Sequence, residues 1–266
     1  MGIIEIFIFL LGLAVGSFLN VAIHRLPRDE SVVKPGSRCP KCEKAIRWYD
    51  NLPVLSYVLL GGRCRHCREG ISFRYPLVEL VSGLLWYVSW RSSGGTAAFL
   101  VPVVFNSLLL VMALADLETG LIPDEASLGG IAAGLLVSFF WPELHGTSTG
   151  LLGLAWSVVG LLAGGGLIYL TGVAGNWIFQ RELAKLGLDQ SMGGGDVKLL
   201  AMAGSFLGWE KVLLAFFIAP IASLPFALYQ RIAKKEQIIP YGPFLALACA
   251  VQFYFGETIW AWFVRV

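Results

Sequence analysis

Long apolar segments constrain this chain more than any other feature. Of its 266 residues, 56% are apolar and only 14% are charged. A helix crosses the hydrocarbon of a bilayer with about 20 mostly apolar residues, and several segments have that length. The first, Ile3 to Ile23, follows no basic stretch and precedes no small-residue cleavage site. We therefore expect a membrane protein whose first helix is retained rather than removed as a signal peptide.

The apolar pattern predicts an all-α polytopic membrane protein with about eight transmembrane helices. The predicted spans are Ile3 to Ile23, Tyr75 to Trp90, Thr96 to Ala115, Asp124 to Trp141, Thr149 to Phe179, Val197 to Gly208, Val212 to Tyr229 and Pro243 to Phe263. Val197 to Gly208 is short, so it either spans the membrane or re-enters the same face.

The basic residues orient these spans. Eleven of the 20 Lys and Arg residues fall between Arg25 and Arg74, and basic loops are retained on the cytoplasmic side of a membrane. Alternating from this cytoplasmic loop places both termini outside. The same alternation places Asp116, at the end of one span, and Asp196, at the start of another, at the cytoplasmic membrane face.

Four of the five cysteines stand in two close pairs within the basic loop. The pairs are Cys39-Pro40-Lys41-Cys42 and Cys64-Arg65-His66-Cys67. Four thiolates at this spacing can hold Zn tetrahedrally and leave no open position for water, so we predict a structural zinc site formed by Cys39, Cys42, Cys64 and Cys67. Two disulfides are the alternative, which a reducing cytoplasm disfavours. A bound metal would stabilise this loop of about fifty residues, which is too small to form a large hydrophobic core by itself.

Two acidic residues border apolar runs, and two interpretations of them stay open. Asp116 and Asp196 could form a pair of carboxylates that share one proton and hydrolyse a peptide without a Ser or Cys nucleophile. Alternatively, Asp196 caps the helix that follows it, where it would accept backbone N–H bonds and favour the helix dipole. We favour capping for Asp124, which follows Pro123. Capping does not apply to Asp116, because it follows its apolar run, where the dipole opposes a negative charge.

Glycines and a further acid also stand out within the apolar segments. Gly193, Gly194 and Gly195 precede Asp196, and they either let a peptide chain approach closely or form a flexible linker. The glycines from Gly164 to Gly166 lie inside a predicted span, where close helix packing is the expected use. Glu79 lies within the second predicted span, where an ionisable residue is a functional candidate. We expect it to pair with a basic residue at the membrane face or to contact a ligand.

An ordered set of motifs runs along most of the chain. It comprises Gly16-Ser17-Phe18-Leu19-Asn20-Val21, Arg25-Leu26-Pro27, the two cysteine pairs, Asp50-Asn51-Leu52-Pro53, Arg74-Tyr75-Pro76-Leu77-Val78-Glu79, Asp116 through Pro123-Asp124, Gly193-Gly194-Gly195-Asp196-Val197-Lys198-Leu199 and Pro240-Tyr241-Gly242-Pro243-Phe244. In this order the motifs closely resemble the type IV prepilin peptidase family, which are bifunctional membrane enzymes with a Gly-x-Gly-Asp motif. The ordered set is far more specific than that motif alone.

The resemblance implies a function and residues that perform it. It implies that Asp116 and Asp196 are the catalytic aspartates, with Gly193, Gly195 and Lys198 as supporting residues of the motif. It further implies cleavage of a short basic leader from type IV prepilins and related pseudopilins, followed by N-methylation of the new amino terminus from S-adenosylmethionine. Methylation is associated by resemblance with the zinc loop and its adjoining helices, and its candidate residues are Glu79, Gly83, Asn20 and Arg25. Packing and snorkelling are equally open roles for the last two.

We expect three parts in the chain and a defined cellular setting. Residues 1–24 form the first transmembrane helix, residues 25–74 a cytoplasmic zinc-binding domain associated with methylation, and residues 75–266 a transmembrane aspartic peptidase domain. The resemblance implies the bacterial inner membrane, an active site at its cytoplasmic face, and prepilins or pseudopilins as substrates. It also implies lipid and the pilus or type II secretion machinery as partners, and no nucleic acid.

Two other classes of protein stay open on the residues alone. One is a transporter in which Asp116 and Asp196 relay protons, although transporters often carry paired internal repeats and none is evident here. The other is a non-catalytic assembly scaffold with a zinc knuckle. A scaffold gives no reason to place two acids at the same membrane depth.

Overall fold

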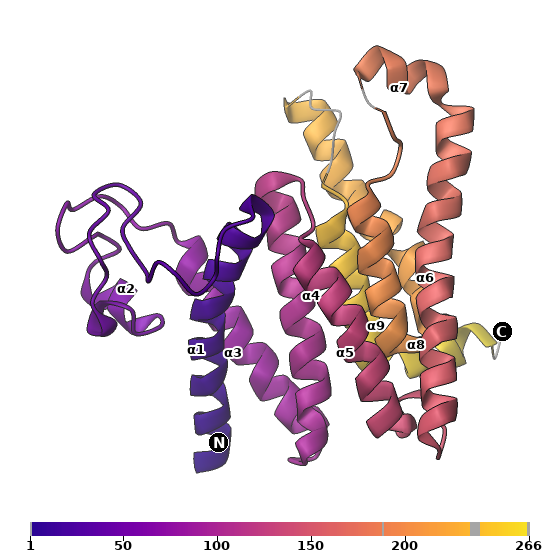
Figure 1. Ribbon diagram of the computed structural model, residues 1–266, viewed down its shortest axis with the longest axis horizontal. Coiled ribbons are helices and arrows are strands. Elements are labelled where there is room, and N and C mark those ends of the chain that lie inside the picture. Colours follow the sequence, from indigo (N-terminus) through magenta and orange to yellow (C-terminus); the bar gives the residue numbers. More distant parts are fainter. Residues whose placement is uncertain (1, 188, 235–239, 265–266) are drawn as a thin grey trace. The chain divides into compact units, whose positions relative to one another are not determined.

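The chain is helical and divides into two compact units. A computed structural model describes residues 2–187, 189–234 and 240–264, and no β-strand occurs among these residues. The first unit ends at Ser107 and the second begins at Leu108. Each unit is described by itself below, with the labels shown in Figure 1.

The first unit consists of two long helices and the polar loop between them. Its elements are α1 (Ile3–Arg25), η1 (Leu26–Arg28), η2 (Trp48–Asp50), α2 (Leu55–Leu59), α3 (Arg74–Ser92), η3 (Ala97–Phe99) and the first residues of α4 (Leu100–Thr119). Two isolated β-bridges, Arg38 with Ala45 and Arg63 with Gly70, close small turns within the loop.

Small residues let α1 and α3 pack closely. A Cβ at Gly12 would lie 2.7 Å from the Trp86 Cβ, and one at Gly16 would lie 2.7 Å from the Glu79 Cα. Glycines four residues apart form a stripe on one helix face, which is a common device for close helix packing in membranes. The Ser82 hydroxyl donates a hydrogen bond of 2.8 Å to the Gly12 carbonyl across this contact.

Asn20 continues the α1 stripe by one more step of four residues. Its Nδ2 donates hydrogen bonds to the carbonyls of Gly16 (3.3 Å) and Tyr75 (3.1 Å), the second of which lies at the start of α3. At the opposite end of the two helices, Arg91 pairs with Glu5 at 2.8 Å. The helices are therefore antiparallel neighbours, and the loop between them begins and ends next to Asn20.

The second unit is a bundle of helices. It contains the rest of α4, α5 (Asp124–Phe140), η4 (Pro142–His145), α6 (Gly150–Ile178), α7 (Gln180–Leu186), α8 (Gly194–Tyr229), the π-helical η5 (Gln230–Lys234) and α9 (Gly242–Val264). The expected packing role holds for Gly164 and Gly165, because a Cβ at Gly164 would overlap the Leu200 carbonyl and one at Gly165 would lie 3.2 Å from the Ala201 Cβ. Gly166 has no neighbour within 4 Å of a Cβ.

The long helix α8 is a hairpin of two helical halves. Its Gly208 has φ 78° and ψ 172°, a backbone conformation that is essentially restricted to glycine. In a straight helix Leu200 and Val212 would lie about 18 Å apart. Instead, both approach Gly164, where a Cβ would lie 2.8 Å from the Leu200 carbonyl carbon and 3.1 Å from the Val212 Cγ2. The chain therefore reverses at Gly208, as the two orange ribbons in Figure 1 show.

The structure supports the predicted class but not the predicted number of spans. Each of the eight predicted segments lies in a helix, with Val197 to Gly208 and Val212 to Tyr229 forming the two halves of α8. Five helices among the described residues are long and apolar enough to cross a membrane, which makes this a multi-pass membrane protein. The count of eight is not confirmed, and whether Val197 to Gly208 spans or re-enters stays a prediction.

Candidate functional site

The four paired cysteines form one cluster in the loop of the first unit. The Sγ atoms of Cys39, Cys42, Cys64 and Cys67 all lie within 4.8 Å of one another, and those of Cys39 and Cys67 are 3.8 Å apart. Zn–S bonds of about 2.3 Å in a tetrahedron separate the sulfurs by about 3.8 Å. The donor set and its spacing therefore fit a metal ion, and no disulfide joins these cysteines.

The two cysteine pairs have the same backbone hydrogen bonds and turn conformation. The Cys39 N–H donates to the Lys44 carbonyl at 3.0 Å and the Cys64 N–H to the Glu69 carbonyl at 2.8 Å. The residue after the second cysteine of each pair is left-handed, with φ 57° at Glu43 and φ 61° at Arg68. N–H groups of Cys67 and His66 lower the pKa of Cys64 to about 6, whereas burial and the neighbouring thiols raise the pKa of Cys67 to about 11.

Asp116 and Asp196 come together in the second unit. Asp116 lies in the last turn of α4, and Asp196 lies in the first turn of α8. Both carboxyl groups are half-buried and close enough to interact electrostatically. A Cβ at Gly195 would lie 2.9 Å from the Ile122 Cβ, so the glycine lets the start of α8 approach the segment that follows Asp116.

Gly242 is a site residue that the sequence interpretation missed. Its N–H donates a hydrogen bond of 3.0 Å to the Asp116 Oδ2, and a Cβ there would lie only 2.7 Å from the same oxygen. Burial and the nearby charge of Asp196 raise the pKa of the adjacent Tyr241, which keeps its phenol protonated. The signal was the Tyr-Gly-Pro start of the last apolar segment, where a glycine precedes the proline that begins a helix.

Asp196 and Asp124 each lie in the first turn of a helix, where an acid favours the helix dipole. The Asp196 carboxylate accepts a hydrogen bond from the N–H of Gly193, the residue before α8. Asp124 lies in the first turn of α5, directly after the N-cap residue Pro123. The Asp124 carboxylate also pairs with the Lys198 Nζ at 2.5 Å. Lys198 therefore joins the start of α8 to the start of α5.

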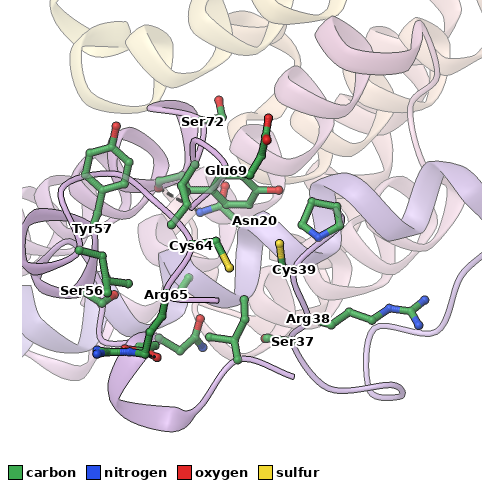
Figure 2. A pocket seen from close by; sticks show the side chains of 18 of the residues that line it. Asn20, Ser37, Arg38, Cys39, Ser56, Tyr57, Cys64, Arg65, Glu69 and Ser72 are labelled. Carbon is green, nitrogen blue, oxygen red and sulfur yellow. Dashed lines mark hydrogen bonds and ion pairs between the residues drawn. The ribbon is translucent and has the colours of Figure 1, made fainter. Parts of the chain in front are cut away.

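A second candidate site is a cavity of about 410 Å³ within the first unit. Its lining includes Asn20, Arg25 and Glu79 from the predicted methylation set, together with two of the clustered cysteines, Cys39 and Cys64. Figure 2 shows Asn20 and both cysteines around the cavity.

The remaining member of the predicted set lies elsewhere. Gly83 is buried in the contact between α1 and α3, where a Cβ would lie 2.8 Å from the Leu13 Cδ2 and 2.9 Å from the Phe9 Cε2. It does not line the cavity. The Arg25 guanidinium donates to the carbonyls of Ser31 (2.9 Å) and Gly36 (3.5 Å), so it fastens the loop to the end of α1.

Comparison with known proteins identifies the family. The profile of the bacterial peptidase A24 N-terminal domain matches residues 10–92, and that of the type IV leader peptidase family matches residues 103–228. A Burkholderia pseudomallei (strain 1026b) protein named prepilin leader peptidase/N-methyltransferase is 37% identical over 96% of this chain and 86% of its own length. The chain belongs to the type IV leader peptidase family. The resemblance inferred from the motifs is thereby confirmed.

Other members of the type IV leader peptidase family carry the same printed name. A Myxococcus xanthus (strain DK1622) relative is 39% identical over 78% of this chain and 57% of its own length. A Klebsiella pneumoniae relative is 38% identical over 82% of this chain and 91% of its own length. No solved structure matches the chain. The segment that matches the leader peptidase profile contains Asp116 and Asp196, and the N-terminal match contains the cysteine cluster and the cavity.

Proposed function

We propose that this protein removes the leader from type IV prepilins and related pseudopilins and then N-methylates the new amino terminus. The observation that carries the proposal is the approach of Asp116 and Asp196 at the ends of α4 and α8, within the segment matched by the leader peptidase profile. The printed names of the relatives support both chemistries. A transporter or a scaffold with a zinc knuckle would need neither of them.

In the proposed cleavage, the two carboxyl groups share one proton and act on a peptide bond together. The ionised one takes a proton from water as the water oxygen bonds to the carbonyl carbon, and the protonated one donates a hydrogen bond to the carbonyl oxygen. The amine then leaves with a proton as the C–N bond breaks. Gly193 and Gly242 hold one oxygen of each carboxylate through backbone N–H groups, so these oxygens keep a fixed orientation during the reaction.

We assign methylation to the first unit, with S-adenosylmethionine as the methyl donor. When bound, the donor would supply a methyl group from its sulfonium sulfur, which would keep the bonding electrons as a thioether, to the new amino-terminal nitrogen, which would lose a proton. Asn20 and Glu79 line the cavity, Arg25 fastens the loop to α1, and Gly83 keeps α1 and α3 close. Zinc held by the four cysteines would be structural, because a closed shell of four protein ligands leaves no position for substrate.

The proposed setting is the bacterial inner membrane, with the aspartates at its cytoplasmic face. The concentration of basic residues between Arg25 and Arg74 supports a cytoplasmic loop, and Asp116 and Asp196 alternate to the same side in the proposed topology. A positively charged leader would suit an acidic pair of residues. Within this proposal, residues 1–24, 25–74 and 75–266 are the first span, the zinc-binding domain and the peptidase domain.

The deciding experiment is a two-product assay on the protein purified in detergent. Given a prepilin and S-adenosylmethionine, it should release a shortened protein that is heavier by one methyl group, as measured by intact mass. Asp116→Asn and Asp196→Asn should each slow cleavage about 100-fold or more, because loss of a general acid or base costs that much. Asp189→Asn, at an exposed loop aspartate, is the matched control. A wild-type cleavage rate in either of the first two variants would remove the assignment.

A further inference from the structure

The lining of the cavity in the first unit contains a buried hydrogen-bond acceptor that has no donor among the described residues. Asn20 is only 3% exposed, and its Nδ2 donates hydrogen bonds to the carbonyls of Gly16 and Tyr75. Its Oδ1 has no hydrogen-bond partner among the described residues. A buried polar atom left without a partner costs free energy, so an acceptor of this kind in a cavity lining indicates a ligand that donates a hydrogen bond.

Glu79 adds a buried carboxyl group to the same cavity. The residue is 8% exposed, and its carboxylate accepts hydrogen bonds from the Val54 N–H, at 2.7 Å, and from the Ser17 hydroxyl. Both partners are neutral, and no ion pair of Glu79 is found in the described part of the chain. The expectation that Glu79 pairs with a basic residue therefore finds no support, and a buried charge without a counter-ion is costly.

The backbone next to Glu79 is strained. Val54, which donates to the carboxylate, has φ 60° and ψ −47°, a left-handed conformation that is exceptional for a β-branched residue. Strained residues persist where the surrounding structure determines them and gather at ligand sites. The contact therefore holds the loop at Val54 against Glu79, a cavity-lining residue near the start of α3.

The exposed part of the lining carries both signs of charge, from Lys41, Lys44 and Arg65 and from Glu69. Lys41 and Lys44 line the cavity and are exposed, whereas Glu79 and the Asn20 Oδ1 are buried. A ligand that matches this arrangement carries an ammonium group at its buried end and tolerates a carboxylate nearer the solvent. The volume of about 410 Å³ lies within the range of roughly 300–1,000 Å³ that is usual for small-molecule sites.

We propose that this cavity binds the methyl donor through the ammonium group of its amino-acid end. The ammonium group donates hydrogen bonds to the Glu79 carboxylate and to the Asn20 Oδ1. The inference rests on the proposed function, and it places the donor on α1, α3 and the loop between them. A free peptide amino terminus carries the same ammonium chemistry. The volume of the cavity and the mixed charges of its lining favour the compact zwitterionic donor.

Binding measurements with three nucleosides test the proposal on the wild-type protein. S-adenosylmethionine carries the ammonium and the sulfonium, S-adenosylhomocysteine carries the ammonium alone, and methylthioadenosine carries neither. Equilibrium dialysis in detergent should give similar Kd values for the first two and a Kd about tenfold or more higher for the third, because a charge-assisted hydrogen bond contributes that much. A methylthioadenosine Kd equal to that of S-adenosylmethionine would overturn the proposal.

Glu79→Gln gives the complementary test, since the amide keeps an oxygen for the Val54 N–H and loses only the charge. It should raise the Kd of both ammonium-bearing nucleosides about tenfold or more and leave that of methylthioadenosine unchanged. Asn20→Leu should act in the same direction. Asn106→Leu is the matched control, because Asn106 is also 3% exposed and does not line the cavity. Wild-type metal content in each variant checks that the loop has folded.

Several outcomes would contradict the assignment and are separable from failure of the function. Unchanged Kd values in Glu79→Gln, or a weakening confined to S-adenosylmethionine, would exclude an ammonium site at Glu79. So would binding of a short peptide with a free amino terminus, but not of its acetylated form or of the donor. If methylated product still forms in these cases, only the cavity assignment fails. If the wild-type protein forms none, methylation itself fails.

Discussion

Three aspartates of the second unit show how the surroundings of a carboxylate decide its role. Asp116 faces the Gly242 N–H and Asp196 faces the Gly193 N–H, with each carboxyl group near the other. Asp124 is exposed and pairs with Lys198. An ion pair with Lys198 favours the ionised form of Asp124, whereas Asp116 and Asp196 are half-buried, lie near each other and have no ion pair among the described residues, which favours a shared proton. The structure thus separates Asp124 from the proposed catalytic pair.

We predict that Lys198 positions the helices rather than taking part in the chemistry. Lys198→Met should slow prepilin cleavage by about fivefold at most, because partly exposed ion pairs contribute about 0–1 kcal/mol. The charge swap of Lys198→Asp with Asp124→Lys should restore most of the rate, as measured by initial rates at saturating substrate. A loss of 100-fold or more, with no rescue by the swap, would instead place Lys198 among the catalytic residues.

The sequence supported some site residues better than others. Asp116 was identifiable because no capping role could explain an acid after an apolar run, and the cysteines because their spacing matches zinc sites. The role of Gly242 was not identified from the sequence, because its contribution is a backbone N–H that donates to a residue 126 positions away. The buried Oδ1 of Asn20 was equally hidden, since only the fold decides which carboxamide atoms find partners.

At the scale of elements, the pattern of apolar runs located every long helix but not their turns. Each predicted span lies within a helix because apolar length is encoded locally. The two halves of α8 correspond to the separate spans predicted at Val197 to Gly208 and Val212 to Tyr229, but the sequence did not show that Gly208, with a φ of 78°, makes the reversal without a connecting loop. The packing partner of the hairpin, the glycine face of α6, depends on contacts distant in sequence.

We expect Gly208→Ala to destabilise the second unit. The glycine-only conformation at this position costs a residue with a side chain about 1–3 kcal/mol, and the new Cβ would lie 3.3 Å from the His145 Nδ1. Gly166→Ala in α6 is the control, because a Cβ there meets nothing within 4 Å and alanine favours a helix. Thermal unfolding in detergent should show a lower Tm for the first variant alone; equal Tm values would mean that the reversal tolerates side chains.

The cysteine cluster should couple metal binding to the cavity beside it. Cys39→Ser and Cys64→Ser change residues that both belong to the cluster and line the cavity, so they should lower bound zinc and weaken donor binding together. Cys249→Ser, at the cysteine of α9 outside the cluster, is the control for thiol loss. Zinc content by elemental analysis and donor Kd are the measurements. Unchanged zinc in the first two variants would remove the four-cysteine site.

At the scale of the whole molecule, the proposed chemistries use residues of different units. The cavity lies entirely before Ser107, and the carboxylate pair lies after Leu108. The two family profiles likewise match residues 10–92 and 103–228 separately. One chain therefore carries two sites, each built from its own helices.

This division predicts that single substitutions separate the two activities. Glu79→Gln should yield shortened but unmethylated product, with cleavage within about twofold of wild type because Asp116 and Asp196 lie in the other unit. Asp196→Asn should stop cleavage and keep the wild-type Kd for the donor. Intact mass of the product and donor binding are measured in parallel on the same preparations. Joint loss of both properties in either variant would mean that the units act as one.

The reversal at Gly208 also bears on how the chain enters the membrane during synthesis. The two halves of α8 meet without an intervening polar loop, and the first half, from Gly194 to Leu207, is short compared with the bilayer. A segment of that length gains little from lipid contact alone, so we expect it to insert together with the second half of α8 and to bring Asp196 to the membrane as part of a helical pair.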